Sequence, residues 1–214
     1  MLDSPAPGVH IAQPEQGFRY GSEAFWMVGF ALERGAPDRA LDLGTGSGIA
    51  AFLLARLGIP ATGIDKNAAW KPLWARSCRA SEVVPILQVA DIKGGVEGSW
   101  PLIISNPPFF PADAGPASPN PWRASARTES TATLADFEAL ARDALTPEGR
   151  ACFVIPASRV SEIREPTRVV RVGQRRALVE FHAEARPCEE AVHLDPGSAR
   201  VRQWYARVGA SPPP

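Results

Sequence analysis

The sequence predicts an α/β fold of three layers, in which helices cover both faces of a mostly parallel sheet. One observation behind this prediction is that short apolar runs alternate with longer amphipathic segments along the 214 residues, as in chains that build parallel sheets. Another is that several runs end at an aspartate or asparagine, at the end of the sheet where such folds bind ligands. A third is a hairpin pattern near the C-terminal end, which adds an antiparallel terminal strand and gives a seven-stranded sheet.

The expected elements follow one another in the order typical of this architecture. Residues 1–14 are rich in proline and small residues and are expected to form a loose arm, after which Ser22 caps a helix over residues 23–34. Residues 1–38 thus make an N-terminal arm and capping helix, and residues 39–214 make the α/β domain. The predicted strands are residues 39–43, 61–64, 86–90, 102–105, 151–155, 168–172 and 177–183. The further helices are residues 49–57, 68–80, 133–145 and 198–208, and residues 110–127 form a long Pro/Ala/Ser loop.

Composition is that of a globular protein and excludes several classes. The hydrophobic fraction is 45% and the charged fraction 21%, and equal numbers of basic and acidic residues, 23 each, give zero net charge. The seven arginines of residues 159–186 form either a solvated face or a local basic surface. Three scattered cysteines without a C-x-x-C pair predict neither a disulfide framework nor a metal site. The cysteine usage indicates a reducing compartment, so we expect a cytoplasmic protein, and we expect it to be a monomer. No apolar run is long enough to span a bilayer, so we expect no membrane partner.

A glycine-rich turn, Asp42-x-Gly44-x-Gly46-x-Gly48, follows the first predicted strand and opens a helix. Glycines allow a tight turn and the close approach of a ligand to the main chain. The dinucleotide fingerprint G-x-G-x-x-G fails because Ile49 occupies the position of its third glycine, and no G-K-[ST] follows for a triphosphate. A carboxylate at Asp42 would repel a pyrophosphate but suits a ligand with ammonium and sulfonium charges. The pattern therefore indicates S-adenosyl-L-methionine, and a purely structural turn is the alternative.

Two further aspartates end the next two predicted strands. Asp65 lies at the distance from the glycine turn where α/β nucleotide folds place an acid for the ribose hydroxyls. Asp91 is placed to accept a hydrogen bond from an adenine amino group, with the backbone of Ile92 beside the ring. Solvated loop aspartates are the alternative for both.

The fourth predicted strand runs directly into Asn106-Pro107-Pro108-Phe109-Phe110. Neither proline can donate to a sheet ladder, and Pro107 forces Asn106 into an extended conformation. An amide oxygen, a fixed carbonyl and an aromatic face at the end of a strand suit a flat molecule that carries an amino group. An ordinary stiff corner is the alternative.

In this order, the glycine turn, the acid after the second strand and the N-P-P-F motif resemble the class I S-adenosylmethionine-dependent methyltransferases, in particular their amino-group branch. Within this branch the chain is similar to the bacterial tRNA adenine-N6 methyltransferases that modify the anticodon loop of valine tRNA. The likeness rests on the segment Gln13–Gly21, on the second aromatic residue Phe110, and on Ala126–Glu129, and covers roughly residues 13–185. The chain departs from that family at Thr128, where His is usual, and at Phe109, where Tyr is usual.

The resemblance implies a Rossmann-like methyltransferase fold, a nucleic-acid partner in the form of tRNA, and methyl transfer to an amino nitrogen without a metal. The Asn106 side chain and the Pro107 carbonyl would accept from the two N–H bonds of that nitrogen, and Asn106 would also face the cofactor. Phe109 would stack on the acceptor ring. The substrate-binding residues implied are Phe18, Arg19, Tyr20, Phe110 and Arg127, with Arg127, Arg175 and Arg176 as candidates for phosphate contacts.

Other activities share parts of this motif set. Glutamine-N5 methylation of a translation factor is disfavoured because that family carries a substantial helical domain before the first strand. Methylation of DNA adenine or of rRNA guanine-N2, and a methyltransferase-like binding module without activity, are the remaining alternatives. The sequence leaves the acceptor open.

Overall fold

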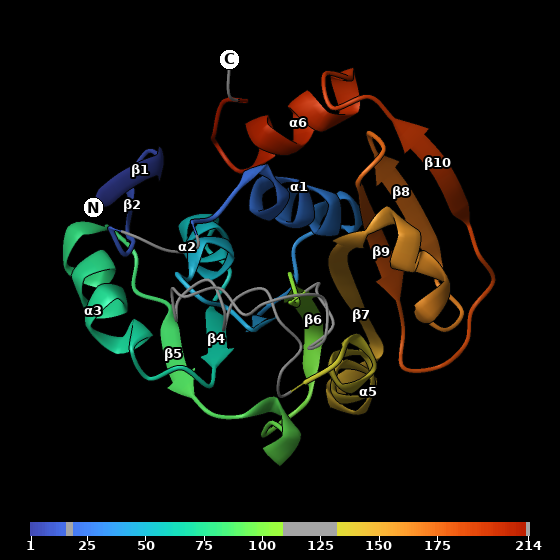
Figure 1. The fold of residues 1–214 in the computed structure, drawn as a ribbon, viewed down its shortest axis with the longest axis horizontal. Helices are drawn as coiled ribbons and strands as arrows, with labels where there is room; N and C mark the ends of the chain where they lie inside the picture. Colours follow the sequence, from blue (N-terminus) through green and yellow to red (C-terminus); the bar gives the residue numbers. More distant parts are fainter. Residues whose placement is uncertain (16–18, 109–131, 213–214) are drawn as a thin grey trace, which may run out of the picture.

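The computed structural model describes residues 1–15, 19–108 and 132–212, and its core is an eight-stranded sheet with helices on both faces (Figure 1). The strands are β1 (Leu2–Ala6), β2 (Val9–Ala12), β3 (Ala40–Leu43), β4 (Ala61–Asp65), β5 (Ile86–Val89), β6 (Trp100–Ser105), β7 (Leu145–Pro156), β8 (Arg168–Val172), β9 (Arg176–Phe181) and β10 (Glu190–Leu194). The helices are α1 (Ser22–Ala31), α2 (Ile49–Arg56), α3 (Trp70–Ala80), α5 (Leu134–Ala144) and α6 (Ala199–Arg207), with short 3₁₀ turns η1 (Leu32–Arg34), η2 (Ile92–Gly94) and η3 (Ala157–Glu162).

The sheet has the strand order β10-β8-β9-β7-β6-β3-β4-β5. Neighbouring strands are parallel except where β9 pairs with β7 and β8. Apolar residues of α1, α2 and α6 cover one face, and those of α5, η2 and the β7–β8 connection cover the other. The predicted α/β class is therefore confirmed.

Two details of the sheet differ from the prediction. The antiparallel strand β9 lies inside the sheet, between β7 and β8, and β10 adds an eighth strand at the edge. This edge strand pairs only with β8, and its residues are exposed or half-buried. The Glu190–Leu194 segment thus lacks the apolar run by which buried strands are predicted.

The N-terminal segment is not a loose arm, as the sequence predicted, but a hairpin of β1 and β2 docked on α3. The backbone amide of Ala12 donates to Ser77 Oγ at 2.8 Å, and that of His10 donates to Ser81 Oγ at 2.8 Å. Ser77 of α3 and Ser81, the C-cap residue of that helix, satisfy backbone groups on the outer side of a short edge strand, which would otherwise need water. The proline-rich composition gave no sign of this contact because both serines lie more than sixty positions away.

Helix α1 is buried on nearly all sides, because α6 packs across it on the side away from the sheet (Figure 1). The helix begins at Ser22, and its N-cap is Gly21, so the predicted cap at Ser22 is wrong by one residue. The two helices come very close at Gly29 of α1, where an added Cβ atom would lie 2.3 Å from Cβ and 2.6 Å from Cα of Trp204 in α6. A side chain at this position would force the two helices apart.

We expect Gly29→Ala to lower the free energy of unfolding by about 1–3 kcal/mol, the usual cost of overpacking. The backbone of Trp204 cannot turn aside, so the loss exceeds the roughly 1 kcal/mol that alanine gains over glycine in a helix. Urea denaturation measures the change. Gly197→Ala is the matched control, because nothing lies within 4 Å of its Cβ position. Equal stability of the two variants would contradict the close packing of α1 and α6.

Among the arginines of residues 159–186, Arg168 belongs neither to a solvated face nor to an open basic surface. Arg168 is only 3% exposed and pairs with Glu180 at 3.1 Å and Glu190 at 3.0 Å. Arg200 of α6 pairs with Glu33 at 2.7 Å and also with Glu190. This network joins β8, β9, β10, η1 and α6, and its glutamates neutralise both arginines.

Candidate active site

A cavity of about 410 Å³ opens at the carboxyl ends of β3, β4 and β6, a volume within the range of small-molecule sites. Its lining brings together every predicted cofactor residue: Asp42, Gly44, Gly46, Asp65, Asp91, Ile92 and Asn106. Pro107, Arg19 and Tyr20 also line it. The remaining predicted residues, Phe18, Phe109, Phe110 and Arg127, lie outside the described residues, as does Thr128. The cavity has the position that the strand-end aspartates predicted.

The glycine turn is tied to the end of β4 through Asp65. Gly46 has a φ of +54°, a conformation that favours glycine, and its amide donates to Asp65 Oδ2 at 2.9 Å. The Asn67 amide donates to Asp65 Oδ1 at 2.8 Å. Each carboxylate oxygen keeps a further lone pair, so the carboxylate is oriented and still able to accept two hydroxyl groups. Burial raises the pKa of Asp65 above its ordinary value.

Asp42 lies beneath the same turn and is almost fully buried, at 3% exposed. Its Oδ2 accepts a hydrogen bond from Thr45 Oγ1 at 2.6 Å. Burial is the largest influence on this carboxyl, and together with the nearby Asp65 charge it raises the pKa of Asp42 to about 7. A cationic ligand in the cavity would stabilise the ionised form.

The raised pKa gives this residue a pH dependence opposite to ordinary acid denaturation. Between about pH 4 and pH 7 the folded chain holds a proton on Asp42 that the unfolded chain has released, so this group's contribution to stability falls as the pH rises. In the absence of cofactor, we expect Asp42→Asn to gain stability relative to wild type by the order of a few kcal/mol on going from pH 5 to pH 8. Urea denaturation at both pH values measures this. An identical difference at pH 5 and pH 8 would contradict the prediction.

Asn106 follows β6 and lines the cavity. Among the described residues, its Oδ1 is buried and has no hydrogen-bond partner. Just before it, Ser105 Oγ donates to the Leu43 carbonyl at 2.8 Å, which fixes the end of β6 against β3. Leaving a buried acceptor unpaired costs about 1–3 kcal/mol, so this oxygen is a candidate to accept a hydrogen bond from a ligand. Pro107, also buried, stops the strand at this point.

The segment at Arg19 and Tyr20 is held on the rim of the cavity by the N-terminal hairpin. Gln13 is 1% exposed, and its Oε1 accepts from the Tyr20 amide at 3.0 Å. Asp3 of β1 pairs with Arg19 at 2.7 Å and also accepts from the Gln13 side chain. Burial raises the pKa of Tyr20 to about 12, so its hydroxyl is neutral at physiological pH.

Several lining residues were missed by the sequence analysis. Trp70, from the first turn of α3, lies beneath Gly46, and Phe137 of α5 lies 3.2 Å from the Cβ position of Gly44. By contrast, Arg176 was predicted as a candidate for phosphate contacts; it lines the rim and pairs with Glu23 of α1 at 3.0 Å. Thr45 had a local signal, since it stands within the glycine turn. Phe137 had none, because it reaches the site through packing of α5.

The chemistry of the site rests on carboxylates and amides. Within the part of the chain that the structure describes, no group of three or more His, Cys, Asp or Glu residues is arranged to hold a metal ion. No helix of the described residues is long and apolar enough to cross a membrane.

The sequence is similar to a set of curated bacterial enzymes. It is 33% identical over 159 residues to the tRNA1(Val) (adenine(37)-N6)-methyltransferase of Aeromonas salmonicida, with 72% of this chain and 66% of the relative covered. It is 30% identical over 169 residues to the enzyme of the same name from Porphyromonas gingivalis strain W83, with 72% and 65% covered. The chain thus spans just under two thirds of the length of these relatives. No protein-family model matches it.

Solved structures share the fold at low sequence identity. The T. thermophilus 16S rRNA N2 G1207 methyltransferase, solved with AdoMet and guanosine, has a TM-score of 0.62 at 19% identity and covers 87% of this chain and 50% of its own. A ribosomal protein L11 methylase from Lactobacillus delbrueckii has a TM-score of 0.59 at 19% identity and covers 81% and 84%.

The chain has the fold of the class I S-adenosyl-L-methionine-dependent methyltransferases and resembles their tRNA-modifying members in sequence, in agreement with the predicted cofactor, S-adenosyl-L-methionine. Within that class it is homologous, at about 30% identity, to the tRNA1(Val) (adenine(37)-N6)-methyltransferases.

Proposed function

We propose that this chain transfers a methyl group from S-adenosyl-L-methionine to the N6 amino group of an adenine in tRNA. The observation that carries the proposal is the unpaired, buried Oδ1 of Asn106 in the same cavity as the glycine turn and its two carboxylates. An acceptor without a protein partner at this point suits an amino group that arrives with the substrate.

The residues of the cavity fit the cofactor. The buried Asp42 carboxylate offers a negative charge to a cationic ligand, and the oriented Asp65 carboxylate offers two acceptors to a ribose. Gly44, with a φ of +68°, leaves the main chain of the turn open on the cavity side. Ile92 is buried beside Asp91 and gives an apolar surface for an adenine ring.

Methyl transfer to an exocyclic amine needs its lone pair directed at the donor. When bound, S-adenosyl-L-methionine supplies a methyl group activated by a positively charged sulfur. Asn106 Oδ1 and the Pro107 carbonyl would accept from the two N–H bonds, which orients the nitrogen and stabilises the positive charge that grows on it. Placement of the nitrogen at a fixed strand end also contributes to the rate by alignment.

Homology supports the choice of acceptor. Both relatives described above carry the name of an adenine-N6 methyltransferase of tRNA1(Val). A base in an anticodon loop is already partly unstacked, so the cost of moving it into a cavity of this kind is low. Because the chain spans just under two thirds of the length of these relatives, the acceptor is part of the proposal and is tested by methylation of the tRNA.

The test is methylation of an in vitro transcript of tRNA1(Val) with tritiated S-adenosyl-L-methionine, followed by mass spectrometry of the nucleosides. We expect N6-methyladenosine, and we expect none from a transcript in which adenine 37 is replaced by guanine. Uptake as N2-methylguanosine would redirect the proposal to another base. No uptake into any tRNA would refute it.

A further inference from the structure

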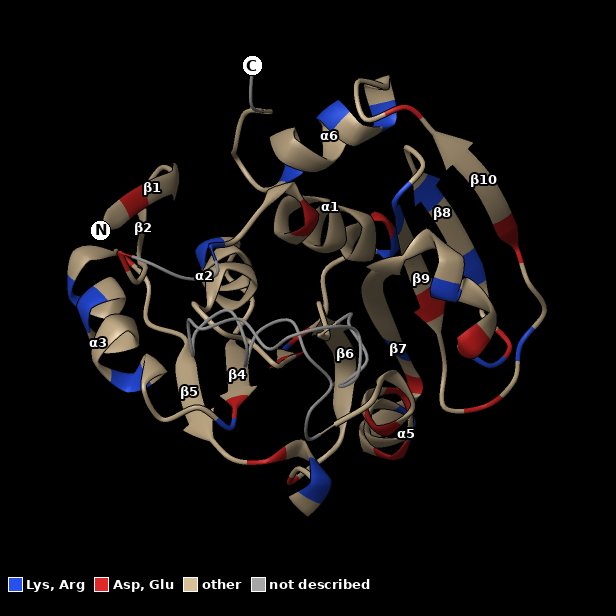
Figure 2. Cartoon of the chain, viewed as in Figure 1, with Lys and Arg blue, Asp and Glu red and all other residues tan. Residues whose placement is uncertain are grey.

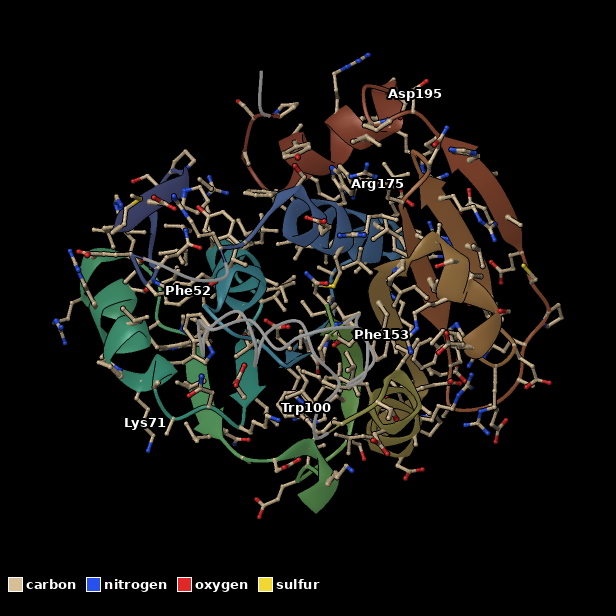
Figure 3. The ribbon with its side chains drawn as sticks, in the orientation of Figure 1. Phe52, Lys71, Trp100, Phe153, Arg175 and Asp195 are labelled. Atoms are coloured by element: carbon tan, nitrogen blue, oxygen red, sulfur yellow. The ribbon has the colours of Figure 1, made fainter. Side chains whose placement is uncertain are left out.

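Helix α3 carries basic residues along its solvent side and no acidic residue. Lys71, Arg76 and Arg79 are all exposed, whereas Trp70 and Trp74 are buried on the opposite side. At 100° per residue, the three cations fall within a 140° arc of the helix. Figure 2 shows this run of basic residues on α3, and Figure 3 shows Lys71 projecting away from the body of the protein.

These cations differ from most arginines of the C-terminal part. Within the described residues, no hydrogen bond or ion pair to a side chain of Lys71, Arg76 or Arg79 is formed. By contrast, Arg168 and Arg200 are neutralised by glutamates in their own network. Although the chain has zero net charge, α3 therefore presents uncompensated positive charge to the solvent. A local face of this kind is sufficient to attract a polyanion.

The basic side of α3 begins at the cavity. Lys66, Asn67 and Trp70 line it, and Lys71 is the next residue along the chain. From Lys71 the helix extends away for eight residues to Arg79, about 12 Å at a rise of 1.5 Å per residue. The three cations of α3 therefore extend outward from the cavity, and the exposed Lys66 lies at the cavity itself.

We propose that the exposed side of α3, formed by Lys71, Arg76 and Arg79, binds the phosphodiester backbone of the RNA whose base enters the cavity. The inference rests on the proposed function: the reacting base occupies the cavity, and the rest of the RNA binds to this surface. Contacts to phosphate position a nucleic acid without reading its sequence. The face therefore supplies affinity and register, and the cavity supplies the choice of base.

The test is a triple substitution, K71Q/R76Q/R79Q, with the tRNA1(Val) transcript as the binding probe at several salt concentrations. Each lost phosphate contact lowers the slope of log affinity against log salt by about 0.7–0.9, so the triple variant should lose roughly two units of slope. We expect its affinity for the transcript to fall roughly tenfold or more near 100 mM salt. The matched control, R186Q/R202Q/R207Q, removes the same charge from exposed or partly exposed arginines elsewhere, and should bind within about twofold of wild type.

Calorimetry with S-adenosylhomocysteine verifies that the cofactor site of each variant is intact. A triple variant that binds the transcript like wild type would overturn the inference, as would an equal loss in the control or a wild-type chain that binds no RNA. Binding to anionic lipid vesicles is measured in parallel. If the triple variant loses binding to the vesicles but not to the transcript, the inference is overturned in favour of a membrane surface. The proposed function is judged separately by N6-methyladenosine, so either conclusion can fail while the other stands.

Discussion

Asn106→Ala is expected to lower kcat for methyl transfer by about 100- to 1,000-fold, the loss typical when one preorganised polar group at a reacting centre is removed. The substitution deletes the buried oxygen that has no partner among the described residues. Because that oxygen interacts most strongly as charge develops on the nitrogen, the loss should appear in kcat more than in the affinity for the cofactor. Single-turnover methylation of the tRNA1(Val) transcript measures it.

Asn67→Ala is the matched control, because Asn67 lines the same cavity but its Oδ1 is occupied by the Ala69 amide at 3.0 Å. We expect a change in kcat of less than about tenfold for the control. Near wild-type turnover by Asn106→Ala, with an unchanged unfolding temperature, would remove Asn106 from the catalytic role.

Asp65→Ala is expected to weaken cofactor binding about 100-fold. The carboxylate would accept two hydroxyl groups, and the loss of hydrogen bonds to a charged group costs about 1.5–3 kcal/mol each before partial compensation by water. The substitution also frees the amides of Gly46 and Asn67, so the glycine turn loses its anchor. Calorimetric titration with S-adenosylhomocysteine measures the affinity.

Two variants make this result specific. Asp65→Asn keeps an acceptor oxygen and should retain more affinity than the alanine variant. Asp195→Ala removes an exposed aspartate on the outer side of the molecule (Figure 3) and should leave the affinity within about twofold of wild type. Equal affinities for Asp65→Ala and Asp195→Ala would show that Asp65 does not contact the cofactor.

The strand-end residues were predictable because the determinants are local. In a parallel sheet, Asp42, Asp65 and Asn106 reach the same edge whatever the loops do, so their position in the sequence is enough to bring them together. The glycine turn was predictable for a similar reason, since Gly46 needs a backbone conformation that few other residues adopt.

What the sequence did not predict depends on contacts between distant segments. Phe137 enters the site because α5 packs over the sheet, and the hairpin of β1 and β2 is fixed by serines in α3 and at its C-terminal cap. The network around the buried Arg168 joins elements separated by more than a hundred positions, and nothing in an arginine-rich composition distinguishes a buried pair from an exposed one. Side-chain pairing across such distances is set by the finished fold.

The crossing of α1 and α6 couples the ends of the described chain during synthesis. Glu23, Ala24 and Met27 of α1 line the cavity, and α1 is covered by Trp204 and Tyr205 of α6. A ribosome releases the first helix early, but its packing partner emerges only after residues 199–207 have been translated. Co-translational folding therefore leaves this wall of the cofactor cavity incomplete until the last helix docks, and a nascent chain that lacks it should not retain the cofactor.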